Sequence, residues 1–130
     1  MQRIPEKWQW FYQARFGLFI HWGAYSRYGR GEQILFREHL DQTEYAAQAC
    51  SWKPTHCDMS AWADTAAQAG MGYAVLTTRH HDGFCLWDSK QTDYTTASQA
   101  AGRDFVREYV EAFRAAGLRV GGGITARRTE

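Results

Sequence analysis

The chain has no long hydrophobic run, and this limits what it can be. No stretch reaches the roughly 18 consecutive apolar residues that a helix needs to cross a bilayer. Residues 1–7 do not form the apolar segment of a secretory signal. We therefore expect no membrane partner. The net charge is only +1, which predicts no basic surface for a polyanion, so we also expect no nucleic-acid partner.

Cysteine is scarce as well. The three cysteines, Cys50, Cys57 and Cys85, are odd in number and widely spaced. This argues against a disulfide framework and for a reducing compartment, so the expected location is cytoplasmic. Apart from the adjacent His56 and Cys57, which are a weak candidate, no Cys or His pair has the spacing of a zinc site. We expect no metal and no other cofactor.

Aromatic residues are abundant by contrast. They make up 15% of the chain and include six tryptophans. Two interpretations stay open for each ring: it fills the core, or it offers a flat apolar face on which a sugar ring stacks.

Two short apolar segments each end at histidine. A strand predicted at residues 16–20 is followed by His21, and a second, at 73–78, is followed by His80 and His81. Buried strands whose carboxyl ends open onto a site have this pattern. A third strand is predicted at 118–124, although its three consecutive glycines should weaken it.

Helical signals alternate with these strands. Capping residues, apolar spacing and terminal glycines predict short helices at 8–14 and 41–49, and longer ones from 58 or 60 to 69 and at 104–116. Residues 24–40 are expected to be irregular, and 79–101 a long loop. Alternating strands and helices predict an α/β fold with parallel strands, whose chemistry lies at the strand carboxyl ends.

These motifs resemble one enzyme family. The segments Phe-Gly-Leu-Phe-Ile-His-Trp-Gly at 16–23 and Leu-Thr-Thr-Arg-His-His-Asp-Gly-Phe at 76–84 are together specific. With further matches up to about residue 121, they are similar to the family 29 glycoside hydrolases, the α-L-fucosidases. The resemblance implies a partial (β/α)₈ barrel at residues 1–121, truncated after about the third strand, and an aberrant tail at 122–130.

The resemblance also implies a fucose site. By motif, His21, Glu32, His80 and His81 should contact fucose hydroxyls, because neutral imidazole both donates and accepts and a carboxylate accepts two hydroxyl protons. Weaker candidates for the wall of this site are Trp22 and Trp87. The family usually has Trp after the matching Glu, where this chain has Gln33. Asp82 is expected to be a turn residue or to act behind the contacting side chains.

The function implied is retaining hydrolysis of terminal α-L-fucosides, with a fucosylated glycan or L-fucose as ligand. The family's nucleophile and acid/base belong to later strands, so the catalytic residues here are unknown and we expect weak or no turnover. An inactive remnant and a lectin-like fucose binder stay open as alternatives. A metal site at His80, His81 and Asp82 is a minor alternative, because no ligand spacing supports it.

Three barrel strands leave two unpaired sheet edges. We therefore expect the chain to form a homo-oligomer that covers them. The glycine-rich tail at 122–130 is interpreted as an out-of-frame or recombined end.

Overall fold

Three parallel strands form the centre of the structure, a computed structural model that describes residues 3–125. They are β1 (Gly17–Ile20), β2 (Tyr73–Arg79) and β3 (Arg119–Ile124), in the order β1-β2-β3. The predicted α/β architecture with three parallel strands is confirmed. Each helix-containing connection returns the chain to the same end of the sheet, which a parallel arrangement requires.

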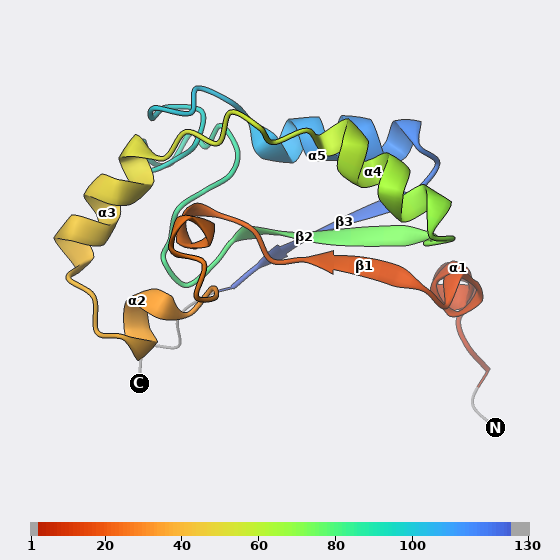
Figure 1. Cartoon of the computed structure of the whole chain (residues 1–130). Helices are drawn as coiled ribbons and strands as arrows, with labels where there is room; N and C mark the ends of the chain where they lie inside the picture. Colours follow the sequence, from red (N-terminus) through yellow and green to blue (C-terminus); the bar gives the residue numbers. More distant parts are fainter. Residues whose placement is uncertain (1–2, 126–130) are drawn as a thin grey trace.

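The strands start level with one another. Gly17 lies opposite Tyr73, and Tyr73 lies opposite Arg119. All three carboxyl ends therefore reach the same edge of the sheet. Figure 1 shows them pointing toward the short helices and α3, whereas α1 lies at the opposite end.

The helices agree with the predicted ones except in the connection after β1. Residues 24–40, expected to be irregular, contain a 3₁₀ helix and a single α-turn, and that expectation was wrong. The helical elements are α1 (Glu6–Ala14), η1 (Ala24–Tyr28), α2 (Ile34–Arg37), α3 (Gln42–Ser51), α4 (Met59–Gln68) and α5 (Phe105–Ala115).

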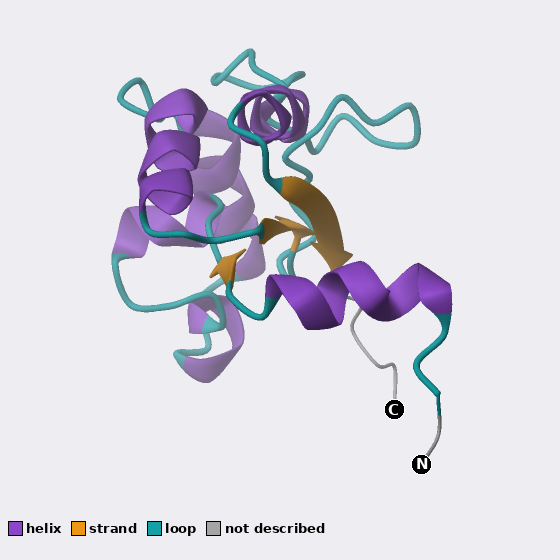
Figure 2. Cartoon of the chain, turned by 90° about the vertical axis from the view of Figure 1, so that its right-hand side faces the viewer, coloured by secondary structure: helices purple, strands orange, loops and turns teal. Residues whose placement is uncertain are grey.

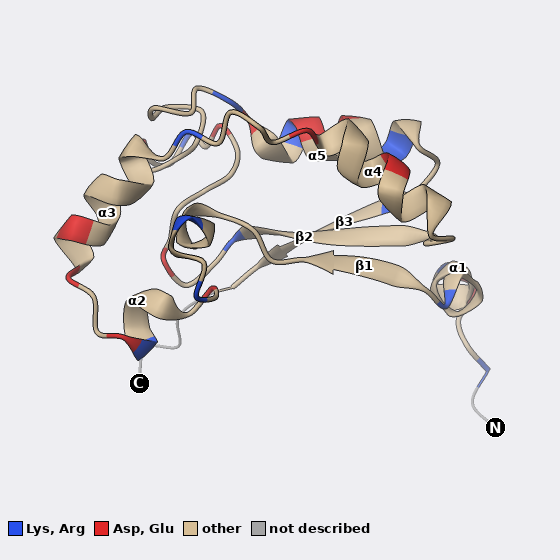
Figure 3. Ribbon diagram, viewed as in Figure 1, with Lys and Arg blue, Asp and Glu red and all other residues tan. Residues whose placement is uncertain are grey.

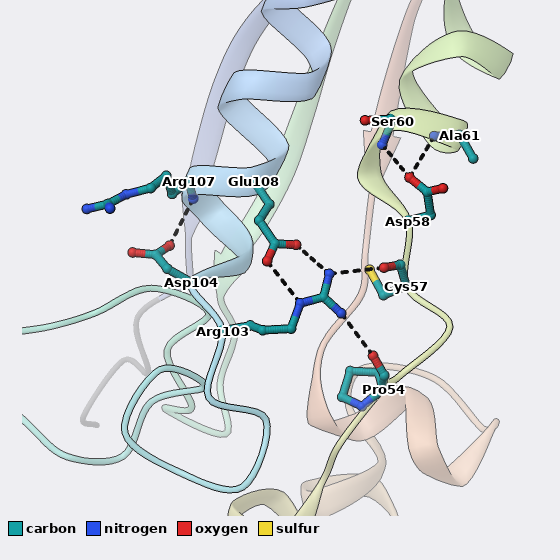
Figure 4. Close-up of polar contacts among 9 residues, drawn as sticks. All are labelled: Pro54, Cys57, Asp58, Ser60, Ala61, Arg103, Asp104, Arg107 and Glu108. Atoms are coloured by element: carbon teal, nitrogen blue, oxygen red, sulfur yellow. Dashed lines mark hydrogen bonds and ion pairs between the residues drawn. The ribbon is translucent and has the colours of Figure 1, made fainter.

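Aspartates begin the three main helices. Asp41 accepts the amide of Glu44, Asp58 accepts those of Ser60 and Ala61, and Asp104 accepts that of Arg107. These bonds satisfy amides that have no partner within the helix, and Figure 4 shows the Asp58 and Asp104 caps. Glycines with positive φ follow two of the helices: Gly70 after α4 and Gly117 after α5.

The core lies between the sheet and two helices. Phe105, Tyr109 and Phe113 form the predicted stripe on α5 and are buried. They pack with α4 over β2, and Figures 1 and 2 show α4 and α5 on one side of the sheet. On the opposite face, the Phe19 side chain of β1 is 62% exposed. One face of the sheet is therefore covered and the other is open.

The three glycines do not prevent β3 from pairing. Gly121, Gly122 and Gly123 all pair with β2, which continues the strand to Ile124. A Cβ on Gly122 would lie 3.2 Å from Cγ2 of Thr78, and the Thr78 hydroxyl donates to the Gly123 carbonyl. Gly122 makes room for Thr78, and the strand continues through all three glycines. The expected tail at 122–130 thus begins inside β3, while residues 126–130 lie outside the described residues.

Most charged side chains lie on the helices and loops; β1 has none, and β2 and β3 carry only Arg79 and Arg119 (Figure 3). All three cysteines are free thiols. Among the helices of residues 3–125, none is long and apolar enough to cross a membrane.

Candidate functional site

The two predicted histidine segments meet at the carboxyl edge of the sheet. His21 directly follows β1 and His80 directly follows β2, and these strands are paired neighbours. The ring centroids of His21 and His80 lie 5.8 Å apart, edge to face. The Phe19 ring lies 4.5 Å from that of His21. The pairing of β1 with β2 therefore builds this cluster from residues 59 positions apart in the sequence.

His81 lies beside His80 instead of pointing to the opposite face. Adjacent side chains would diverge if the strand continued, but β2 ends at Arg79 and a turn follows. The Gly83 amide donates to the His80 carbonyl, which closes this turn. The His80 and His81 ring centroids are 4.8 Å apart. The bend therefore places His81 with His80 and His21 in one histidine cluster (His21, His80, His81).

His80 is the most deeply placed member of the histidine cluster. The residue is 6% exposed, and within the described chain its Nδ1 atom has no hydrogen-bond partner. Burial, with the neighbouring His81, lowers the pKa of the His80 imidazole below its ordinary value. The ring is therefore neutral at physiological pH and offers one donor and one acceptor.

Tyr25 of η1 packs against His80, and this contact was not predicted from the sequence. Its ring packs edge-on at 5.6 Å from His80, and its hydroxyl lies 3.2 Å from Oγ1 of Thr77. A Cβ on Gly23 would come within 3.0 Å of the Tyr25 ring, so glycine gives it space. Burial raises the pKa of Tyr25 to about 12, so the hydroxyl stays protonated.

Glu32 lies in the loop before α2, within electrostatic reach of the histidine cluster. A hydrogen bond from its own backbone amide lowers the pKa of the Glu32 carboxyl. Partial burial opposes this effect, while His21, His80 and Arg37 lower the pKa further. Glu32 is therefore a carboxylate at neutral pH, within electrostatic reach of the neutral His80 ring and the Arg37 guanidinium.

Of the two predicted tryptophans, Trp22 directly follows His21, and Trp87 lies in the connection between β2 and α5. Trp22 is half-buried and packs against Trp52, Trp62 and Phe105, so it belongs to the core between the sheet and the helices. This placement does not support the predicted role of Trp22 in the wall of the sugar site. Hydrogen bonds join both neighbours of Trp87 to the start of α5. The Val106 amide donates to the Leu86 carbonyl, and the Asp88 amide donates to the Asp104 carboxylate.

The described residues contain no cluster of three or more His, Cys, Asp or Glu side chains that could hold a metal ion. The arrangement provides three imidazoles, of which the buried His80 is neutral, and the carboxylate of Glu32. Such groups bind hydroxyls by accepting and donating hydrogen bonds.

Known proteins match both the sequence and the fold. The sequence model of the family described as alpha-L-fucosidase matches residues 2–125.

The chain belongs to the alpha-L-fucosidase family.

Individual alpha-L-fucosidases agree with this assignment. The tissue alpha-L-fucosidase of Rattus norvegicus is 32% identical over 130 residues, covering 87% of this chain and 28% of that protein. The structure of alpha-L-fucosidase isoenzyme 1 from Paenibacillus thiaminolyticus is similar with a TM-score of 0.88 at 50% identity, covering 92% of this chain and 28% of that one. A GH29 alpha-L-fucosidase from Bacteroides thetaiotaomicron, trapped as a covalent intermediate, is similar with a TM-score of 0.86 at 34% identity, covering 95% and 30%.

The chain therefore spans less than a third of these alpha-L-fucosidases. The family match runs through β3 to residue 125. The division into a domain at 1–121 and a separate tail stays a prediction.

Proposed function

We propose that the histidine cluster and Glu32 bind a terminal α-L-fucosyl group, and that this chain supplies part of the active site of a fucoside-hydrolysing enzyme. The observation that carries the proposal is the buried, neutral His80 ring, whose Nδ1 has no partner within the described chain. A buried polar atom without a partner costs free energy, and a sugar hydroxyl would satisfy it.

The chemistry of the remaining groups fits the same ligand. His21 and His81 flank His80 with their rings 5.8 and 4.8 Å away. Each hydroxyl of a pyranose both donates and accepts, as a neutral imidazole does. The Glu32 carboxylate accepts two hydroxyl protons through charge-assisted bonds. Adjacent sugar hydroxyls could be bound in this way without any metal ligand.

Hydrolysis needs more than this set. The Bacteroides relative was trapped as a covalent intermediate, which fits a retaining mechanism with a nucleophile and an acid/base about 5–5.5 Å apart. We assign neither role to Glu32 or Asp82: Glu32 lies within electrostatic reach of His21 and His80, and Asp82 is engaged by Tyr45 and Phe84. We propose that this chain alone binds fucose with weak or no turnover.

Self-association is a further part of the proposal. Phe19 in β1 and Ile124 in β3 are 62% and 64% exposed, although both belong to strands. A second copy that covers these strands would remove apolar surface and unpaired edges from water. The proposed assembly is therefore a homo-oligomer in which the open sheet is covered.

The binding proposal is tested by titrating L-fucose into the chain and following it by calorimetry. We expect His80→Ala to weaken binding about tenfold or more, the change for one lost hydrogen bond in a buried site. His56→Ala is the matched control, because His56 is exposed and lies before α4. Equal affinity in the two variants would contradict the assignment. Adding a chromogenic α-L-fucoside to the same samples separates an enzyme from a binder.

A further inference from the structure

The turn that carries His80 and His81 is tied to a distant helix by a hydrogen bond between a buried tyrosine and a partly buried aspartate. The Tyr45 hydroxyl, on α3, donates to Oδ2 of Asp82 at 2.6 Å. The Asp82 Oδ1 atom accepts the Phe84 amide at 3.1 Å. Both carboxylate oxygens are thus engaged, one by the turn itself and one by a residue 37 positions earlier.

Tyr45 is itself held rigidly. The residue is 2% exposed, and its ring stacks on Tyr28 of η1 at 5.7 Å with only 6° between the ring planes. Its hydroxyl therefore reaches Asp82 from a ring that packing already fixes. Tyr28 and Tyr25 lie on the same short helix, so the supports of Asp82 and of His80 share one element.

Burial and the nearby Asp82 carboxyl keep the Tyr45 hydroxyl protonated, so that it can donate its hydrogen bond to Asp82. Burial and the nearby Asp82 carboxyl raise the pKa of Tyr45, so its hydroxyl does not ionise in the physiological range. Burial also raises the pKa of Asp82, against the hydrogen bonds from Tyr45 and Phe84 and the charges of Arg79 and His81. Removing the hydroxyl would leave a buried carboxylate oxygen without its donor.

We infer that Tyr45 and Asp82 are positioning residues that set the orientation of the His80 and His81 rings for ligand binding. Asp82 adjoins His81 in the chain, and the Gly83 amide closes the turn onto the His80 carbonyl. A shift of Asp82 therefore moves the backbone that carries both rings. Neither residue needs to contact the sugar. The expected effect on L-fucose binding rests on the proposed function, whereas the orientation of the two rings is a property of the unliganded protein.

Tyr45→Phe isolates the hydroxyl, because it keeps the stacked ring. Tyr109→Phe is the matched control: Tyr109 is 1% exposed and donates to the carbonyls of Ala74 and Gly121, within the sheet. The readout is the imidazole nitrogen and carbon-bound proton signals of His80 and His81 by NMR, recorded with and without L-fucose.

We expect Tyr45→Phe to shift both imidazole signal sets in the free protein and to weaken L-fucose binding about tenfold, while Tyr109→Phe lowers stability and leaves those signals unchanged. Unchanged signals in Tyr45→Phe, or equal shifts in both variants, overturn the inference. If the wild-type chain does not bind L-fucose, the proposed function fails, whereas the signals of the free protein still decide the positioning role. Asp82→Asn, read in the same way, replaces Tyr45→Phe if that variant does not fold.

Discussion

Single residues already set the chemistry of the candidate site. His80 directly follows β2 and is buried, with its ring against those of Tyr25 and His81. An unpaired buried imidazole is tolerated in its neutral form and opposed in its charged form. The same burial that prepares His80 for a hydroxyl should therefore make the fold sensitive to acid.

The pH dependence of stability tests this burial. Because burial lowers the pKa of His80 in the folded state, the folded protein binds this proton more weakly than the unfolded chain. The contribution of neutral His80 is complete above its unfolded pKa of about 6.5 and is lost as the pH falls toward the lowered value. We expect urea unfolding at pH 7.5 and 5.5 to show this loss in the wild type, with a slope of at most about 1.4 kcal/mol per pH unit.

His80→Gln is the reference for that measurement, because glutamine stays neutral throughout. The unfolding free energy of the wild type minus that of His80→Gln should become smaller on acidification. A constant difference between the two pH values would show that His80 titrates as an exposed histidine.

Gly17 illustrates a close contact at the other end of the sheet. A Cβ at this position would overlap the Tyr73 ring, which packs on Trp10 and Phe11 of α1. Gly17→Ala must push Tyr73 away and should lower the free energy of unfolding by about 1–3 kcal/mol. Gly123→Ala is the control, because its Cβ would lie 3.9 Å from the Leu76 carbonyl oxygen. We expect that control to be neutral or slightly stabilising; an equal loss in both variants would refute the steric explanation.

At the scale of elements, one arginine joins the chain before α4 to the start of α5. Figure 4 shows Arg103 donating to both carboxylate oxygens of Glu108 and to the carbonyls of Pro54 and Cys57. Its guanidinium also lies 4.6 Å from the centre of the Phe105 ring. One side chain therefore links the segment before α4 to the first turns of α5.

Arg103→Met removes these polar contacts and keeps much of the apolar stem. We expect a loss of about 1–2 kcal/mol in thermal or urea unfolding, a modest value because Arg103 and Glu108 are each about a third exposed. Arg107→Met is the matched control, since the Arg107 side chain extends away from the network (Figure 4). Indistinguishable unfolding curves for the two variants would mean that the network adds no stability.

Elements were predictable where local signals are strong. The stripe Phe105, Tyr109, Phe113 and the caps Asp41 and Asp104 identify their helices directly. The histidines after β1 and β2 indicated the site because parallel neighbours end at one edge. The short turns in residues 24–40 carry no such periodicity, so η1 and α2 were missed.

The supports of the site were not predictable from local pattern. The contacts of Tyr25 with Thr77 and of Tyr45 with Asp82 join residues 52 and 37 positions apart. Nothing near a tyrosine in the sequence specifies such a partner. Trp22 was considered for the sugar site by motif, whereas in the structure its ring packs against Trp52 and the core.

At the scale of the whole molecule, residues 3–125 leave one face of the sheet and its two outer edges, β1 and β3, uncovered. A groove of about 370 Å³ runs between β1 and α4, lined by residues that include Leu18, Trp62 and Met71. The exposed apolar residues of the outer strands β1 and β3 favour association with another polypeptide segment or with a second copy of the chain.

Ile124→Lys tests the proposed association. A lysine on the exposed edge of β3 disfavours pairing with another strand. We expect wild-type protein to sediment faster as its concentration rises in the micromolar range, and Ile124→Lys to do so less. Gln68→Lys, on the exposed side of α4, adds the same charge away from the edge. A wild-type chain that sediments as a folded monomer throughout would contradict the proposal.

A crystal structure of the chain with L-fucose tests the central claim most directly. The account predicts fucose at the carboxyl edge of β1 and β2, with hydroxyls within hydrogen-bonding distance of His80 and of at least one of His21, His81 and Glu32. The account would be contradicted if, at a saturating concentration of L-fucose, the sugar bound at another surface and only water contacted the histidine cluster.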